Sequence, residues 1–450
     1  MDYRQRLHRA IPGGAHTYSR GDDQYPENAP PILSHGKGAY VWDADGRRYL
    51  DYGMALRAVT VGYAHEGIAA AAQAEIAKGN QLTRPSLTEL QAAELLIDLI
   101  PGADMVKFGK NGSTVTTAAV KMARAFNGRK YVAVCADHPF FSYDDWFIGV
   151  TPIQRGIPEE SASLTLKFHY GDISSLQALF DQYPDQISCV MLEPATTVAP
   201  CPGGCTRMSN QTPCALCPDN HSIYLHKVKE LCHKKGALFI LDEMITGFRW
   251  HQKGAQFYYG VEPDLATFGK GMANGFSVAA LVGKREVMNL GGIDDQGAER
   301  VFLISTTHGA EMCGLGAFIK TVEVYRESDV VGSLWKYGVR LLSGMTSIAT
   351  DLGIQDYFQV EGYPCSPSYV TKDKDGVVSL PLRTLFNQEM IRNGVLIPWI
   401  ALSASHGETE LSFTMEAVRK SLAVYAQALD KGTAAYLKGS VIKPVFRRRN

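Results

Sequence analysis

The chain has 450 residues, of which 45% are hydrophobic and 20% charged, and 45 Lys and Arg against 46 Asp and Glu give a net charge of −1. This length predicts two or three domains, or one large one, with a sizeable buried core. The balanced charge, without basic blocks, argues against non-specific nucleic-acid binding, which needs many cations against phosphates. The composition excludes disorder, collagen and coiled coil.

The first residues and the cysteines of the chain indicate its cellular location. The first residues have no apolar segment of the kind found in secretory signals, and no apolar run approaches the ~20 residues of a membrane span. Five of the nine cysteines are scattered, as is usual for thiols in a reducing cytosol. We therefore expect a soluble, cytoplasmic protein without a membrane partner.

The N-terminal region is expected to form an irregular arm followed by a hairpin, because Asp45-Gly46 separates two aromatic and β-branched runs at 38–43 and 48–52. From about residue 63, helical patterns alternate with short apolar runs. The expected strands are 131–135, 187–192, 237–241, 265–268 and 278–282, and the expected helices are 113–126, 173–182 and 222–235. Strands that are apolar throughout and separated by helices predict an α/β fold with a mainly parallel sheet.

The C-terminal third has strong helical patterns at 310–327 and 414–429 around a more mixed segment. This predicts a second, smaller α+β domain, completed by the N-terminal hairpin. The expected division is a large domain over 63–314 and a small domain made of 1–62 and 315–450.

The most informative chemistry follows two of the expected strands. Asp242 and Glu243 come at the end of the first, and Lys270 follows the second after a glycine. Ligands of open α/β sheets bind at these strand ends. A lysine in a partly desolvated site can form a Schiff base, and an acidic neighbour can keep a pyridine nitrogen protonated. Taken singly, a solvated Asp-Glu pair and a surface lysine are the alternatives.

The segments 241–249 and 263–270 resemble the class III aminotransferases among the fold-type I pyridoxal-phosphate (PLP) enzymes. They look closest to the branch similar to glutamate-1-semialdehyde 2,1-aminomutase, and the similarity runs from Pro12 to the last helix. The resemblance implies the PLP-dependent transferase fold, with a mainly parallel, seven-stranded type of sheet in the large domain. It also implies that Lys270 forms the Schiff base with PLP and moves the proton, that Asp242 pairs with the pyridinium nitrogen, and that Ile245 packs on one ring face.

Other positions match the family's cofactor pocket. The start of the 113–126 helix, an anion site through its backbone N–H groups and dipole, would bind the phosphate, although an ordinary helix cap is the alternative. In relatives a threonine at the position of Thr307 reaches the phosphate from the partner subunit, which implies a homodimer. The resemblance assigns cofactor binding to Asn111, Gly112, Ser113, Phe140, Glu193 and Thr307, with His138 as an alternative to Phe140 as the stacking position.

Three further residues are candidates for substrate binding. Arg20 lies in a segment that resembles the aminomutase's carboxylate-binding region, where a guanidinium can bind a carboxylate in a bidentate fork; a surface arginine is the alternative. Arg57 is a second anion-binding candidate, and Trp399 is expected near the ligand. The stretch 394–402 has no acid where the aminomutase has one, which favours ordinary transamination.

Four cysteines cluster in an expected insertion at 200–218. They are Cys201, Cys205, Cys214 and Cys217, with the spacing Cx3C-x8-CxxC. Thiolates on short Pro and Gly loops suit zinc or an iron–sulfur cluster. Unligated thiols are the alternative.

The sequence therefore predicts a homodimeric, PLP-dependent aminotransferase that moves an amino group from a donor to an aldehyde or ketone acceptor. A 2,1-aminomutase is the first alternative. A metal-bearing binding protein without catalysis is the second, and the presence of Lys270 and Asp242 argues against it.

Overall fold

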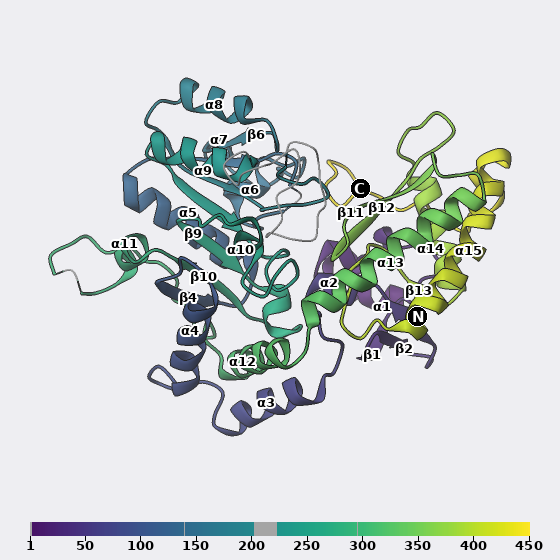
Figure 1. The fold of residues 1–450 in the computed structure, drawn as a ribbon, viewed down its shortest axis with the longest axis horizontal. Helices are drawn as coiled ribbons and strands as arrows, with labels where there is room; N and C mark the ends of the chain where they lie inside the picture. The colour runs from purple at the N-terminus through teal and green to yellow at the C-terminus, as the bar shows by residue number, and fades with distance from the viewer. Residues whose placement is uncertain (1, 139, 202–222, 295) are drawn as a thin grey trace. The chain divides into compact units, whose positions relative to one another are not determined.

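The computed structural model describes residues 2–138, 140–201, 223–294 and 296–450 (Figure 1). The chain divides into two compact units. The large unit comprises Glu66–Val331 with Arg448–Asn450, and the small unit comprises Met1–His65 with Gly332–Arg447. The domain boundaries expected from the sequence, at residues 62/63 and 314/315, stay a prediction.

A seven-stranded sheet forms the centre of the large unit. Its strands, in spatial order, are β4 (Met105–Gly109), β10 (Ala279–Gly283), β9 (Leu265–Phe268), β8 (Leu238–Asp242), β7 (Ile187–Leu192), β5 (Tyr131–Cys135) and β6 (Thr165–Phe168). The pairs from β9 to β6 are all parallel, and only β10 pairs antiparallel with both of its neighbours. The α/β fold with a mainly parallel sheet is confirmed.

The inner strands of this sheet are buried along their whole length, which explains their uniformly apolar sequences. Helix α5 (Gly112–Asn127) packs against β7, β9 and β10. Val115, Ala118, Ala119 and Met122 of this helix are buried, whereas Phe126 in its last turn is exposed. One hydrophobic core of the unit therefore lies between α5 and the sheet.

The remaining helices of the large unit surround the sheet (Figure 1). They are α3 (Glu66–Ala77), α4 (Leu87–Leu99), α6 (Asp145–Ile148), α7 (Glu159–Ser163), α8 (Ile173–Gln182), α9 (Tyr224–Lys234), α10 (Ala255–Tyr259), η5 (Lys270–Ala273), α11 (Arg285–Met288), η6 (Asn289–Gly291) and α12 (Met312–Glu327). Helix α12 packs on α3, α4 and η5. Within the described residues, no helix is long and apolar enough to span a bilayer.

The small unit contains a four-stranded sheet in the order β1 (Leu33–Lys37), β2 (Tyr40–Asp43), β3 (Arg48–Asp51) and β13 (Val395–Leu396). Strands β2 and β3 form the expected antiparallel hairpin, whereas β13 joins β3 in parallel. In the hairpin turn, the Asp43 carboxylate accepts the backbone N–H groups of Asp45 at 3.0 Å and Arg47 at 2.8 Å, and the Tyr49 hydroxyl at 3.3 Å.

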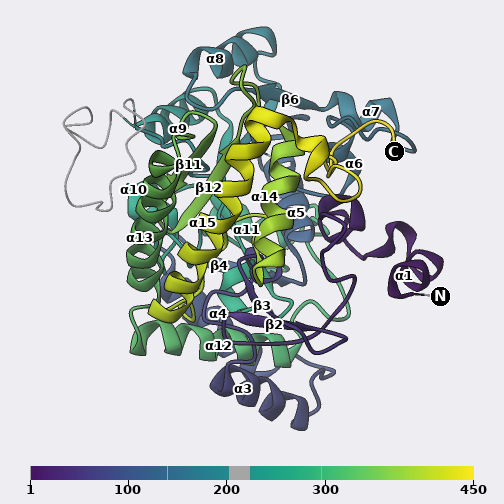
Figure 2. The ribbon, with the colours of Figure 1, turned by 90° about the vertical axis from the view of Figure 1, so that its right-hand side faces the viewer.

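The other elements of the small unit come from both ends of the chain. They are α1 (Tyr3–Ala10), η1 (Pro12–Gly14), η2 (Tyr18–Arg20), η3 (Asp22–Gln24), α2 (Met54–Arg57), α13 (Val330–Asp351, in this unit from Gly332), β11 (Phe358–Tyr363), β12 (Ser366–Thr371), α14 (Leu380–Arg392), α15 (Glu408–Lys431) and η7 (Thr433–Ala435). Helices α14 and α15 pack side by side (Figure 2). Strands β11 and β12 form a separate antiparallel pair.

Candidate active site

Asp242 and Lys270 stand at neighbouring strand ends in the large unit. Asp242 is the last residue of β8, and Lys270 follows the parallel strand β9 by two residues. Asp242 is opposite Thr267 in the strand register. Because parallel neighbours end at the same edge of a sheet, both side chains belong to the edge where α/β proteins bind ligands. Asp242 is fully buried and Lys270 half-buried, so the solvated alternative is wrong for Asp242.

The surroundings of Asp242 hold its carboxylate in place. Both hydrogen bonds described for it go to Oδ1, from the Met244 N–H at 3.0 Å and the Thr267 hydroxyl at 2.9 Å. Burial raises the pKa of Asp242, and the nearby charge of Lys270 and these two hydrogen bonds oppose the rise. Oδ2 is thus the oxygen suited to accept an N–H from a bound ring.

The Met244 side chain lies close both to the start of α5 and to the segment that carries Lys270. A Cβ at Gly112 would lie 3.2 Å from the Met244 sulfur, and a Cβ at Gly269 would overlap that sulfur. Both glycines therefore permit the turn after Asp242 to approach α5 and the Lys270 segment closely. Asn111, Gly112 and Ser113 lie in the same neighbourhood as Lys270 for this reason.

The start of α5 has the features of an anion site. Asn111 is the N-cap and accepts the Thr114 N–H at 2.9 Å. Ser113 is buried, and its hydroxyl oxygen accepts the Tyr143 N–H at 3.0 Å, which leaves its proton to donate. A 16-residue helix with its N-terminus at a sheet edge favours a phosphate at this position.

Glu243, next to Asp242, has a structural role that the sequence did not indicate. It is fully buried and accepts hydrogen bonds from the Thr246 hydroxyl, the Ala255 N–H at 2.9 Å and the Gln256 N–H at 2.6 Å. Burial raises its pKa to about 7. These bonds hold the loop that follows Asp242, so Glu243 supports the site and does not face it as half of a solvated pair.

The two candidates for the stacking position differ in environment. Phe140 is 43% exposed and packs edge-on against Phe147, with 5.8 Å between ring centroids. His138 is 4% exposed, and its Nδ1 accepts the backbone N–H of Glu193 at 3.0 Å. Within the described chain, its Nε2 has no hydrogen-bond partner. Burial lowers the pKa of His138 to about 4, so the ring is neutral and Nε2 carries its proton.

The remaining cofactor candidates occupy different settings. Glu193 is buried after β7, and Ile245 is half-buried in the turn after β8. Thr307 lies in an exposed turn of the large unit. Cys201 is half-buried, and the other three clustered cysteines lie outside the described residues. In the part of the chain that is described, no three or more His, Cys, Asp or Glu side chains are grouped to hold a metal ion.

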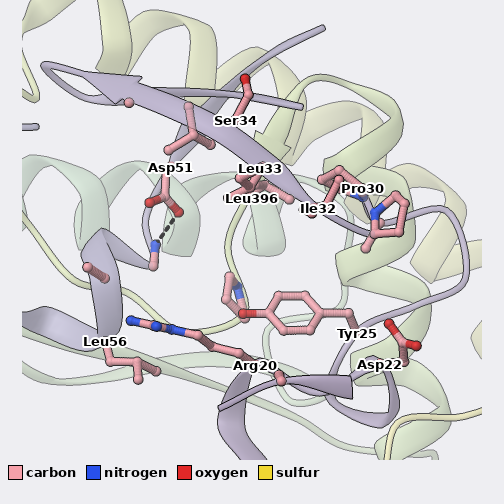
Figure 3. A pocket seen from close by; sticks show the side chains of 18 of the residues that line it. Arg20, Asp22, Tyr25, Pro30, Ile32, Leu33, Ser34, Asp51, Leu56 and Leu396 are labelled. Carbon is pink, nitrogen blue, oxygen red and sulfur yellow. Dashed lines mark hydrogen bonds between the residues drawn. The ribbon is translucent and has the colours of Figure 1, made fainter. Parts of the chain in front are cut away.

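In the small unit, two of the three substrate candidates line one cavity of about 490 Å³ (Figure 3). Arg20 and Trp399 are in its wall, together with Tyr25, Asp51 and Leu56, whereas Arg57 is not. The volume is that of a small-molecule site. In Figure 3 the Arg20 side chain extends toward Leu56, and the Tyr25 hydroxyl lies above it. Burial and the Asp51 charge raise the pKa of Tyr25, while Arg20 opposes the rise, so its hydroxyl stays protonated.

Next to this cavity the backbone adopts an unusual conformation that no sequence signal indicated. All four residues of α2 have positive φ: 39° at Met54, 49° at Ala55, 63° at Leu56 and 69° at Arg57. None is glycine, and left-handed backbone costs other residues about 1–2 kcal/mol each. Such strain persists only where surrounding contacts impose it, and it occurs often at ligand sites.

Comparison with known proteins gives consistent matches. Residues 24–363 match the family described as aminotransferase class-III. The 3-aminobutyryl-CoA aminotransferase of Cloacimonas acidaminovorans (strain Evry) is 31% identical over 425 residues, covering 92% of this chain and 94% of that protein. These matches confirm the predicted resemblance.

Solved structures share the fold. The FumI protein of Sphingopyxis sp. MTA144, determined with PLP, matches with a TM-score of 0.82 and 25% identity over 97% of both chains. A glutamate-1-semialdehyde aminomutase from Pseudomonas aeruginosa PAO1 matches with a TM-score of 0.76 and 17% identity, over 94% of each chain. The second likeness shows the fold alone, so the aminomutase alternative is not better supported than the aminotransferase.

Proposed function

This chain belongs to the class III aminotransferase family of PLP-dependent enzymes, and we propose that Lys270 and Asp242 are its catalytic residues and that its amino donor carries a carboxyl group bound by Arg20. The observation that carries the first part is the placement of Asp242 and Lys270 at adjacent ends of the parallel strands β8 and β9. An amino group passes from the donor to an aldehyde or ketone acceptor.

The described residues fit PLP. The donor set at the start of α5 suits its phosphate, and glycines at 112 and 269 leave space where a Cβ would meet Met244. Asn111, Gly112 and Ser113 would hold the phosphate, Oδ2 of Asp242 would accept the pyridine N–H, and Ile245 and Phe140 or His138 would flank the ring. When bound, PLP supplies an electron sink for negative charge at the carbon that bears the amine.

Each residue then has a defined task. The Lys270 amine would be the attachment point for PLP. As a free amine it would move a proton from the donor carbon to the cofactor and, in the second half of the reaction, from the cofactor to the acceptor carbon. Asp242 would keep the pyridine nitrogen protonated, because its buried charge is stabilised by a partner cation. The fully buried end of β8 excludes water from this contact.

The donor class is proposed from the cavity and from a relative. Arg20 and the Tyr25 hydroxyl offer donors to a carboxylate, and Leu56 and Trp399 offer apolar walls. The relative's name specifies a 3-aminobutyryl thioester, so we propose a 3-amino acid, with 3-aminobutanoate as the first probe. The coenzyme A thioester of this acid is the second substrate in the assay. If only the thioester is turned over, the donor has no free carboxylate for Arg20 to bind.

We also propose a homodimer, a cytoplasmic location and a zinc site. A homodimer is supported by the match at Thr307, which lies in an exposed turn and so is accessible to a second subunit. A cytoplasmic location is supported by the scattered cysteines. Zinc at Cys201, Cys205, Cys214 and Cys217 is supported by their spacing alone.

Borohydride reduction followed by peptide mapping tests the proposal. Reduction of the PLP-loaded enzyme should leave the cofactor covalently on Lys270, and Lys270→Ala should lose both the adduct and at least about 10²-fold in rate. Lys320→Ala, a change at a surface lysine paired with Glu323, is the control and should keep both. An adduct on another lysine would refute the assignment.

A further inference from the structure

We propose that Asp51 is a positioning residue for donor binding. It holds the left-handed turn α2, and this turn places Ala55 and Leu56 in the wall of the Arg20 cavity. The inference rests on the proposed function, because it takes that cavity to receive the carboxyl end of the donor.

Asp51 contacts both the turn and the Tyr63 side chain beyond it. It is 6% exposed, at the end of β3. Its Oδ1 accepts the Gly53 N–H at 2.7 Å, and its Oδ2 accepts the Met54 N–H at 3.0 Å and the Tyr63 hydroxyl at 2.7 Å. Figure 3 shows a hydrogen bond of this carboxylate to the adjoining backbone. Since both oxygens accept, an amide with a single acceptor oxygen cannot reproduce the arrangement.

The rest of the turn is held from other directions. The Trp399 indole N–H donates to the Gly53 carbonyl at 3.0 Å, and the Arg57 and Val59 N–H groups donate to Gly53 and Met54 carbonyls, each at 3.2 Å. None of the four residues of α2 prefers a left-handed backbone by itself. Removing the Asp51 contacts therefore lets these residues return toward ordinary conformations.

Relaxation of the turn would change the cavity at one wall. Ala55 and Leu56 line the cavity together with Arg20 and Tyr25, and in Figure 3 the Arg20 side chain extends toward Leu56. A donor whose carboxylate binds Arg20 would then lose apolar contacts and a defined orientation. The effect belongs to binding, so KM should rise while kcat stays near its original value.

The charge of Asp51 predicts the opposite change. The charge of Asp51 raises the pKa of both Tyr25 and Tyr63, and the charge of Arg20 lowers it. Both charges therefore act on groups that line the cavity. Loss of a negative charge near Arg20 would by itself favour a carboxylate donor and lower KM. The direction of the change in KM therefore separates positioning from electrostatics.

The experiment compares Asp51→Asn with Asp43→Asn in the PLP-loaded enzyme. Asp43 is a matched control, because it is equally buried, at 6%, and also accepts two backbone N–H groups and a tyrosine hydroxyl, but outside the cavity wall. Asp51→Asn should raise KM for 3-aminobutanoate by roughly tenfold, with kcat within about twofold, while Asp43→Asn changes neither. An unchanged or lower KM in Asp51→Asn overturns the inference.

Rescue and a second readout complete the test. Ala55→Gly in the Asp51→Asn background should lower the raised KM part of the way toward its original value, because glycine adopts the left-handed region at little cost. Trypsin should also cleave after Arg57 faster in Asp51→Asn than in either the unmodified enzyme or Asp43→Asn. If Asp51→Asn does not fold, Tyr63→Phe, which removes one donor to Oδ2, replaces it with the same expected direction.

Arg20→Ala separates this inference from the proposed function. If Arg20→Ala raises KM and Asp51→Asn does not, the inference fails and the carboxylate site stands. If neither raises KM, the carboxylate site fails and the inference fails with it. A rise in both, with rescue by Ala55→Gly, supports both.

Discussion

The Thr267 hydroxyl donates a 2.9 Å hydrogen bond to Oδ1 of Asp242 and so joins β9 to β8 just before the turn that carries Lys270. The contact lies in a buried position, where each donor to a carboxylate contributes more than it would in water. It also leaves Oδ2 as the oxygen suited to the cofactor, since the second bond described for Asp242 shares Oδ1.

Thr267→Val should therefore weaken PLP binding about five- to tenfold, as expected for about 1 kcal/mol from one lost hydrogen bond. Loss of the donor raises the pKa of the Asp242 carboxyl further, so less of the ionised form is available to pair with the pyridine nitrogen. The dissociation constant is measured by titrating the cofactor-free protein with PLP. Thr267→Ser keeps the hydroxyl and is the control; equal affinities in the two variants would contradict the prediction.

The sequence predicted the inner strands well and the edge strands poorly. The expected ranges 131–135, 187–192 and 265–268 coincide with β5, β7 and β9, because residues buried on both faces leave an unbroken apolar run. Strands β4 and β6, at the two edges of the sheet, were not predicted. Each includes a solvent-facing lysine, Lys107 or Lys167, which interrupts the apolar pattern.

The candidate site could be predicted only where its chemistry is local in sequence. Asp242 ends one strand and Lys270 follows the next by two residues, so the pattern that predicts the strands also predicts their position. Asp51 and Leu56 could not be found in this way. Their role depends on a backbone conformation imposed by side chains as distant in sequence as Tyr63 and Trp399, and no local residue pattern indicates it.

Acid should destabilise the protein through His138. Its folded pKa of about 4 lies below the ordinary value of 6.5, so an unfolded chain binds a proton in this interval that the folded chain does not. Stability is therefore complete above about pH 6.5 and falls by about 3 kcal/mol as the pH decreases toward 4. Protonation of Nδ1 would also break its bond from the Glu193 N–H.

Unfolding followed at a series of pH values measures this effect. His138→Asn should show a smaller loss of stability between pH 6.5 and 4, because its amide does not titrate. His16→Asn, at an exposed histidine, is the control and should keep the original pH dependence. Parallel curves for all three proteins would show that His138 is not responsible.

Under the proposal that the four clustered cysteines bind zinc, the purified protein should hold roughly one equivalent per chain. Elemental analysis after purification without chelators measures it. Cys205→Ser and Cys217→Ser should each lose metal, whereas Cys313→Ser, at one of the scattered cysteines, should retain it. Less than about a tenth of an equivalent of zinc or iron in the unmodified protein would favour unligated thiols.

Replacing Arg20 and replacing Arg57 should have different effects, although both residues were candidates for binding a carboxylate. Only Arg20 lines the cavity, so Arg20→Ala should raise KM for 3-aminobutanoate by about 10- to 100-fold, the loss expected for a hydrogen-bonded charge. Arg57→Ala should have a much smaller effect. An amine donor without a carboxylate is the second substrate in the assay, and its KM should not change in Arg20→Ala, because it has no group for the guanidinium. A larger effect of Arg57→Ala than of Arg20→Ala would place the carboxylate outside the cavity.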